Sequence, residues 1–165
     1  MSAKPAGSTT QTAGTPSLTI HASAVVIGET GVVIRGPSGC GKSSLVMDLV
    51  FATERMGRFA SLVGDDRIDL DNRGGRLIAR GHRLVLGMVE KRGLGILNVP
   101  HERAVVVGLV VDIVAPQEAV RFPDPEHNHV VLCGVQVPVL ALLRGQAPYD
   151  CAVSVLAYLE RAGAM

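Results

Sequence analysis

A glycine-rich octapeptide in the first third of the chain has the residue types and the spacing needed to hold phosphate groups. It reads Gly36-Pro37-Ser38-Gly39-Cys40-Gly41-Lys42-Ser43 and is followed by Ser44. The segment matches GxxxxGK[ST], in which glycines let backbone N–H groups converge on phosphates, the lysine bridges the outer phosphates and the hydroxyl ligates Mg²⁺. An apolar strand over 32–35 should enter the loop and an amphipathic helix should leave it, so that the helix N-terminus faces the anion. These residues are therefore expected to bind the phosphates of a nucleoside triphosphate with Mg²⁺.

Two adjacent carboxylates follow the next apolar segment. Asp65 and Asp66 come at the end of a short strand predicted over 60–63, where the second-motif aspartate of such a site would face the phosphates. Adjacent residues of a strand point to opposite faces, so both carboxylates reach the pocket only if the strand has already ended. We expect one of the pair to face the phosphates and the other to support it. A solvated turn is the alternative interpretation.

Glu90, Arg92 and His21 are further candidates for the same pocket. A carboxylate at a strand end, such as Glu90, can hold Mg²⁺ directly or through water, and a guanidinium at Arg92 can clamp phosphate oxygens. On its own this charged segment is a weak signal, because glycine-containing charged loops are usually only loops. His21 lies in a strand predicted over 18–27, where it either points at the phosphate-binding loop or is a core histidine with satisfied hydrogen bonds.

The remaining pattern predicts an α/β domain with a strand-rich sheet and few helices. Residues 1–16 are rich in Ser, Thr, Ala, Gly and Pro and are expected to form a flexible tail, which leaves 17–165 as one domain. Helical spacing predicts helices over 43–56 and 148–161. Strands are expected over 18–27, 32–35, 60–63, 68–70, 76–79, 83–89, 104–115, 130–133 and 135–140, with a loop over 90–95. The nearly unbroken apolar run at 104–115 is typical of a central strand.

The overall composition argues against several classes of partner. The formal net charge is +1 and the basic residues are dispersed, which gives no electrostatic footprint for nucleic acid or for an anionic membrane. No segment approaches the roughly 20 apolar residues of a membrane-spanning helix, and the N-terminus has no signal-peptide pattern. Three cysteines without a CxxC pair fit a reducing compartment. We therefore expect a soluble cytoplasmic protein and interpret Cys40 as a small loop residue rather than a redox switch.

Several of these segments together resemble the HPr kinase/phosphorylase family, and more narrowly its short alphaproteobacterial type that consists of the catalytic domain alone. The resemblance rests on His21-Ala22, on GPSGCGKSS, on LVGDD at 62–66 and on EKRGLGILNV at 90–99. The last segment matches the family signature E-x-R-G-L-G-I-x-[ND]-V at every fixed position and is the most specific of them. The segment PYDCA at 148–152 resembles the start of the family's closing helix, so that the resemblance covers roughly residues 18–162.

The resemblance implies a kinase that uses ATP and Mg²⁺ to phosphorylate a serine of the phosphocarrier protein HPr or of its nitrogen-system relative. Phosphorolysis, in which inorganic phosphate attacks the phosphoserine, often accompanies this activity in the family. By position, Asp66 would be the general base for the serine hydroxyl and the acid in the reverse direction, with Asp65 assisting it. Lys42 would hold the β- and γ-phosphates, and Arg92 would stabilise charge on the transferred group.

The same correspondence assigns the metal and the architecture. Ser43 and Glu90 would hold Mg²⁺, and His21 would line the phosphate pocket. The implied fold is a P-loop domain that is more like phosphoenolpyruvate carboxykinase than like eukaryotic protein kinases, and family members assemble as hexamers. The chain departs from full-length relatives, because nothing before residue 17 resembles their N-terminal domain and their R-P-G-R-N segment is missing, with only Arg144 as a substitute. Phosphorolysis and hexamer formation therefore stay open.

Three other functions would use the same loop. GPSGCGKSSL also resembles ATP-binding cassette ATPases, but the chain has no LSGGQ-type segment and no apolar run that ends in Asp-Glu. A small-molecule kinase would explain the loop but not the match over 90–99. A nucleotide-binding switch without phosphoryl transfer would not require the carboxylates of Asp66 and Glu90.

Overall fold

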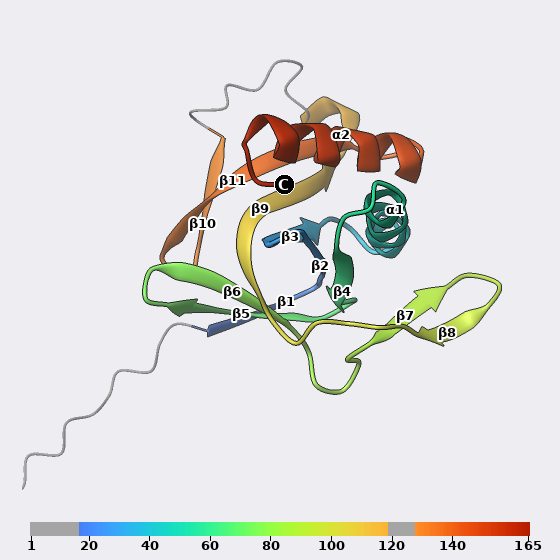
Figure 1. Cartoon of the computed structure of the whole chain (residues 1–165), viewed down its shortest axis with the longest axis horizontal. Coiled ribbons are helices and arrows are strands. Elements are labelled where there is room, and N and C mark those ends of the chain that lie inside the picture. Colours follow the sequence, from blue (N-terminus) through green and yellow to red (C-terminus); the bar gives the residue numbers. More distant parts are fainter. Residues whose placement is uncertain (1–16, 119–127) are drawn as a thin grey trace, which may run out of the picture.

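The computed structural model of the chain describes residues 17–118 and 128–165, which form one large sheet, a separate hairpin and two helices (Figure 1). The helices are α1 (Lys42–Arg55) and α2 (Pro148–Arg161), with a short 3₁₀ turn at Pro116–Glu118. The strands are β1 (Ser17–Ile20), β2 (Ala22–Ile27), β3 (Thr30–Arg35), β4 (Ala60–Gly64), β5 (Ile68–Arg73), β6 (Arg76–Gly81), β7 (Met88–Lys91), β8 (Gly95–Asn98), β9 (Val105–Val114), β10 (His129–Leu132) and β11 (Val135–Leu143). The tail expected at residues 1–16 lies outside the described residues. Within the described ranges, no helix combines the length and the apolar character needed to cross a membrane.

Strand β9 lies at the centre of the large sheet. The hydrogen-bonded order is β1-β5-β6-β9-β3-β2-β4, and β11 also pairs with β9 and carries β10 on its other edge. β9 runs parallel to β3 and β11 and antiparallel to β6. Its sequence VVVGLVVDIV is nearly all apolar, as expected of a strand covered on both faces. The prediction of a central strand over 104–115 is therefore confirmed.

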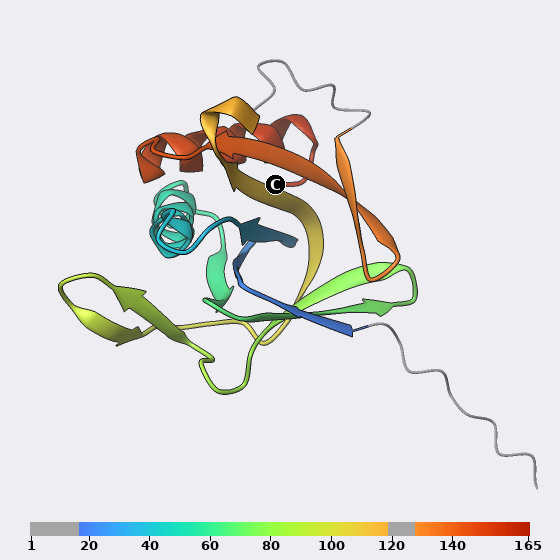
Figure 2. The ribbon, with the colours of Figure 1, turned by 180° about the vertical axis from the view of Figure 1, so that it is seen from behind.

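Side chains on the two faces of the sheet form two separate apolar clusters. On one face, α1 and α2 lie side by side and pack against the strands, as Figures 1 and 2 show from opposite sides. Leu45 of α1 and Leu159 of α2 are buried there against Val25 and Ile34. The second cluster is formed by strands alone, because the sheet curves and brings β5, β6 and β10 over the central strands. The helices predicted over 43–56 and 148–161 are confirmed to within one residue.

The segment predicted as one strand over 18–27 is divided at His21. β1 pairs with β5, whereas β2 pairs with β3 and β4, and His21 forms the bend between the two strands. The prediction of a single strand was wrong because the chain changes pairing partners at this bend, which no local pattern reveals. The bend leaves the His21 side chain 48% exposed, so it is not a core histidine.

The expected strand over 83–89 and the expected loop over 90–95 are both displaced along the chain. Residues 82–87 form turns, and the strand β7 begins only after Gly87, whose φ of 72° interrupts an extended backbone. β7 pairs with β8 as a two-stranded hairpin apart from the large sheet (Figure 1). Glu90 therefore lies in a strand and not in a loop.

Two glycines bring strands β4 and β6 close together where β4 ends. A Cβ placed on Gly64 would lie 2.5 Å from Gly81 Cα, and a Cβ placed on Gly81 would collide with Val63 O. Side chains cannot be accommodated at such a distance, so both positions require glycine. The contact fixes the end of β4 against β6 at Gly64, the residue that directly precedes Asp65.

Asp71 is a buried acidic residue of β5. Its carboxylate accepts hydrogen bonds from Arg73 Nε and Arg80 Nη1, each at 2.5 Å. Burial raises the pKa of Asp71, but the hydrogen bonds and positive charges of Arg80 and Arg73 together outweigh it and hold the pKa below the usual 3.8. The ionised carboxylate therefore stabilises the fold above the unfolded-state pKa, and this contribution is lost as the pH falls through the lowered pKa.

Asp71→Asn should lower the free energy of unfolding at neutral pH, because two guanidinium groups lose their carboxylate partner. The deficit relative to the wild type should shrink once the pH falls below 3.8, where the wild-type carboxyl also begins to protonate. Urea unfolding at a series of pH values measures both effects. A deficit that stays constant down to the most acidic pH would contradict the assignment of the lowered pKa to Asp71.

Candidate functional site

Residues from four distant parts of the chain line one cleft of about 900 Å³ at the N-terminal end of α1. The residues singled out from the sequence that line it are His21, Ser38, Gly39, Gly41, Lys42, Ser43, Ser44, Asp65, Asp66, Glu90 and Arg92. Val85, Met88, Lys91, Gly95 and Ile96 complete the wall. Gly36, Pro37 and Cys40 belong to the loop but do not line the cleft, and neither does Arg144, which follows β11.

The loop between β3 and α1 has a backbone that glycine adopts most readily. The φ angles are 73° at Gly39 and 103° at Gly41, in the left-handed region where a Cβ is strained. Gly41 is the N-cap residue of α1, no side chain caps the helix, and no acidic residue lies in its first turn. The first N–H groups of α1 are therefore available to an anion, which the helix dipole also favours at this end.

Lys42 is folded back over the loop and is only 6% exposed. Its ammonium group donates hydrogen bonds to Gly36 O and Pro37 O, each at 3.0 Å. Among the described residues, no carboxylate forms an ion pair with Lys42. A largely buried ammonium without a counter-ion favours an anionic ligand, since burying an unpaired charge is costly.

Asp65 is buried beside the loop and is held by two hydroxyl groups. Ser23 Oγ donates a hydrogen bond to Asp65 Oδ1 at 2.5 Å, and Ser43 Oγ donates to the same oxygen at 3.0 Å. Ser23 was not singled out from the sequence, although a serine within the apolar segment Ala22–Ile27 is a signal, because a buried hydroxyl needs a partner. The contact crosses from β2 to the end of β4, and it links the acidic pair to the loop through Ser43.

Asp66 and His21 also line the cleft and lie next to each other. His21 Nε2 lies 3.2 Å from Asp66 Oδ1, and the two side chains are 48% and 65% exposed. β4 ends at Gly64, and Asp66 has a φ of 67°, so the alternation of a strand no longer applies to the pair. Asp65 and Asp66 consequently both line the cleft, the first buried and the second open to solvent.

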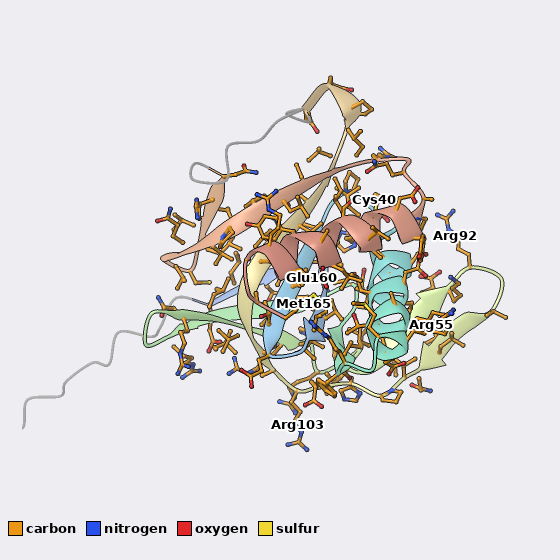
Figure 3. The ribbon with its side chains drawn as sticks, turned by 45° about the horizontal axis from the view of Figure 1, so that its top comes forward. Cys40, Arg55, Arg92, Arg103, Glu160 and Met165 are labelled. Atoms are coloured by element: carbon orange, nitrogen blue, oxygen red, sulfur yellow. The ribbon has the colours of Figure 1, made fainter. Side chains whose placement is uncertain are left out.

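The β7–β8 hairpin supplies a carboxylate and a guanidinium to the same cleft. Glu90 lies in β7 opposite Ile96, and Arg92 lies in the turn that follows. A Cβ placed on Gly39 would lie 3.2 Å from Arg92 Nη2, so the guanidinium reaches the glycine-rich loop between β3 and α1. Figure 3 shows the Arg92 side chain extending away from the strands of the hairpin. The hairpin therefore closes one side of the cleft with groups that suit phosphate and metal.

The oxygen donors in the cleft fit Mg²⁺. This ion takes oxygen ligands and is usually held by one or two carboxylates together with substrate phosphates. Ser43, Asp65 and Glu90 bring such oxygens to one cleft. The described residues contain no group of three or more His, Cys, Asp and Glu side chains that would hold a metal by themselves. The donor set thus suits an ion that completes its coordination with phosphate oxygens.

Comparison with known protein families places the cleft in a family domain. The model of the HPr Serine kinase C-terminal domain matches residues 13–141. The chain belongs to this family. The match contains every residue that lines the cleft, so the cleft is part of the HPr serine kinase domain. The resemblance to HPr kinase/phosphorylase proposed from the sequence is confirmed.

Curated relatives and a solved structure carry the same domain. The HPr kinase/phosphorylase of Mycoplasma mycoides is 38% identical over 84 residues, and that of Clostridium beijerinckii is 37% identical over 84 residues. Each alignment covers 51% of this chain but only 25% or 26% of the relative, so the chain matches about a quarter of the length of these proteins. The structure of the Hpr(Ser) kinase/phosphatase from Coxiella burnetii matches with a TM-score of 0.73 at 27% identity, over 88% of this chain and 99% of that chain. The mixed α/β fold, a large sheet with two helices, is therefore the fold of an HPr kinase domain.

Proposed function

We propose that the chain is an ATP-dependent protein-serine kinase that phosphorylates an HPr-type phosphocarrier protein. In this proposal Gly36–Ser43 is a P-loop that binds ATP, and residues 17–165 act as one catalytic domain. The observation that carries the proposal is the position of Asp66, which lines the same cleft as the ammonium-bearing loop and is held by His21. Its similarity to HPr kinase/phosphorylases and to an Hpr(Ser) kinase/phosphatase supports the proposal.

The loop binds and orients the phosphates of ATP. Backbone N–H groups at the start of α1 donate to the phosphate oxygens, and Lys42 exchanges its two carbonyl partners for the β- and γ-phosphates. Arg92, whose guanidinium lies beside Gly39, stabilises the charge that spreads over the transferred group. Ser43, Glu90 and Asp65 would hold Mg²⁺, which when bound neutralises charge on the phosphates.

The transfer step needs one base and an in-line approach. The serine oxygen of the carrier attacks the γ-phosphorus, and the bond from this phosphorus to the β–γ bridging oxygen breaks, so that ADP leaves with the electron pair. The serine proton passes to Asp66, which is exposed enough to meet a protein substrate and then returns the proton to solvent. His21 Nε2, 3.2 Å from the carboxylate, orients Asp66 for this step.

The same residues can act in the reverse direction as a phosphorolytic site. Inorganic phosphate bound at the loop attacks the phosphoserine phosphorus, pyrophosphate is formed, and Asp66 gives a proton to the leaving serine oxygen. The similar Coxiella burnetii protein is a kinase/phosphatase, which supports this extension. The proposal also includes assembly into a homo-oligomer, which the family resemblance suggests is a hexamer.

Transfer of label from ATP to a carrier tests the proposal directly. Incubation of the chain with γ-labelled ATP, Mg²⁺ and an HPr-type carrier should place the label on a serine of the carrier. Label on a sugar would instead indicate a small-molecule kinase. ATP hydrolysis without any labelled acceptor would indicate an ATP-binding cassette-type ATPase, and binding without turnover a nucleotide switch. Each of these three outcomes would overturn the protein-kinase proposal.

A further inference from the structure

Ser23 is a polar residue in a strand that is otherwise made of Ala, Val and Ile. Every residue of β2 is buried, and Ser23 is 0% exposed. Val25 and Ile27, which alternate with it along the strand, belong to the cluster under α1, so Ser23 faces the same side of the sheet as the phosphate-binding helix. Its pairing partner in β3 is Ile34, close to the point where the chain enters the loop. The hydroxyl is therefore buried behind the cleft and does not line it.

The hydroxyl of Ser23 makes the short contact to Asp65. Ser23 Oγ donates to Asp65 Oδ1 at 2.5 Å, and a hydroxyl that donates to a carboxylate makes a charge-assisted hydrogen bond. Because Ser43 donates to the same oxygen at 3.0 Å, Oδ1 carries both hydroxyl bonds. No arginine, lysine or histidine forms an ion pair with Asp65 among the described residues. The carboxylate is thus fixed by neutral donors, which leave its negative charge to act on the cleft.

We propose that Ser23 is a positioning residue for the divalent cation of the nucleotide. It holds Asp65 in the orientation in which Oδ1 accepts from Ser43 and the carboxylate charge is directed to the cation side of the loop. A neutral donor is suited to this task, since an arginine at the same place would cancel the charge that attracts the metal. The inference rests on the proposed function only in taking the cleft to be a site for nucleotide with Mg²⁺.

The test is the effect of Mg²⁺ on nucleotide affinity in the full chain. Binding of a fluorescent ATP analogue is titrated with Mg²⁺ and, separately, with a chelator, for the wild type and for Ser23→Ala. Ser61→Ala is the matched control, because Ser61 is a buried serine of β4 whose neighbour Leu62 faces α1, so Ser61 faces the other side. Asp65→Ala alone and combined with Ser23→Ala completes a double-mutant cycle. Thermal unfolding confirms that each variant is folded.

Ser23→Ala should reduce the gain in affinity from Mg²⁺ by about tenfold, while affinity without Mg²⁺ stays within about twofold of the wild type. Ser61→Ala should behave as the wild type, and Ser23→Ala should have no further effect in the Asp65→Ala background. The inference would be overturned if Mg²⁺ raised the affinity of Ser23→Ala as much as that of the wild type, or if Ser23→Ala lost as much affinity without Mg²⁺ as with it. Additive effects of Ser23→Ala and Asp65→Ala would also overturn it. A wild type whose nucleotide affinity does not respond to Mg²⁺ would also overturn it. Because the experiment measures nucleotide binding, its outcome does not depend on whether any carrier is phosphorylated.

Discussion

Replacing Asp66 by Asn is expected to lower the rate of carrier phosphorylation by about a thousandfold, within the range that general bases contribute. The amide cannot accept the serine proton, although it keeps the shape of the carboxylate and can still meet His21 Nε2, 3.2 Å away in the wild type. ATP affinity should change by no more than about twofold, because in the proposed mechanism Asp66 meets the serine of the carrier and does not bind the phosphates. Single-turnover labelling of the carrier and equilibrium binding of an ATP analogue measure the two quantities.

Asp69→Asn provides the matched control for this variant. Asp69 lies in β5, accepts a hydrogen bond from Thr19 at 2.6 Å and does not line the cleft, so the same change of charge and shape is made three positions further on. This control should phosphorylate the carrier as the wild type does. A rate for Asp66→Asn within about tenfold of the wild type would show that another group takes the proton. Equal losses in both variants would point to long-range charge and not to a base.

Lys42→Met should weaken ATP binding by about ten- to a hundredfold, which is the effect expected from losing one or two charge-assisted hydrogen bonds. The methionine has a similar length and can occupy the space of a side chain that is only 6% exposed, but it brings no charge to the β- and γ-phosphates. Carrier phosphorylation should fall further than binding, since charge on the transferred group increases in the transition state. Titration of a fluorescent ATP analogue gives the affinity, and saturating labelling experiments give the rate.

Arg55→Met removes one positive charge from the other end of the same helix. Arg55 is the last residue of α1, and its guanidinium lies 5.6 Å from the centre of the Phe51 ring (labelled Arg55 in Figure 3), away from the residues that line the cleft. The Arg55→Met variant should bind ATP with the same affinity as the wild type. If Lys42→Met bound ATP as tightly as Arg55→Met, the loop would not hold the phosphates through Lys42, and the P-loop assignment would fail.

The parts of the site that were predicted from the sequence are those encoded over a few consecutive residues. The loop follows from glycines at fixed spacing before Lys42 and Ser43, and Gly36, Gly39 and Gly41 adopt the positive φ angles that glycine favours. Asp65 and Asp66 were recognised because they end an apolar segment. The signature over 90–99 was found by resemblance, and the prediction of a loop over 90–95 missed the β7–β8 hairpin.

The parts that escaped prediction depend on pairing between distant segments. The bend at His21 arises because β1 pairs with β5, and Ser23 meets Asp65 only because β2 lies beside β4. The apolar residues at 84–86 suggested a strand, but Val85 instead lines the cleft and Leu84 is 77% exposed. Which residues bend, pair or line the cleft depends on neighbours from distant parts of the chain, and the hydrophobic periodicity of the sequence does not reveal these neighbours.

The close contact between Gly64 and Gly81 has a consequence for mutations outside the cleft. The backbone of β6 touches the residue immediately before Asp65, so the place of the acidic pair is set partly by a strand that does not belong to the site. Substitutions in β6 that shift Gly81 by a fraction of an ångström should misalign Asp65 and Asp66 and lower turnover, although β6 contributes no residue to the lining of the cleft. Variation among related domains should therefore be most restricted along β6 at its last residue, Gly81, which carries no chemical group of its own.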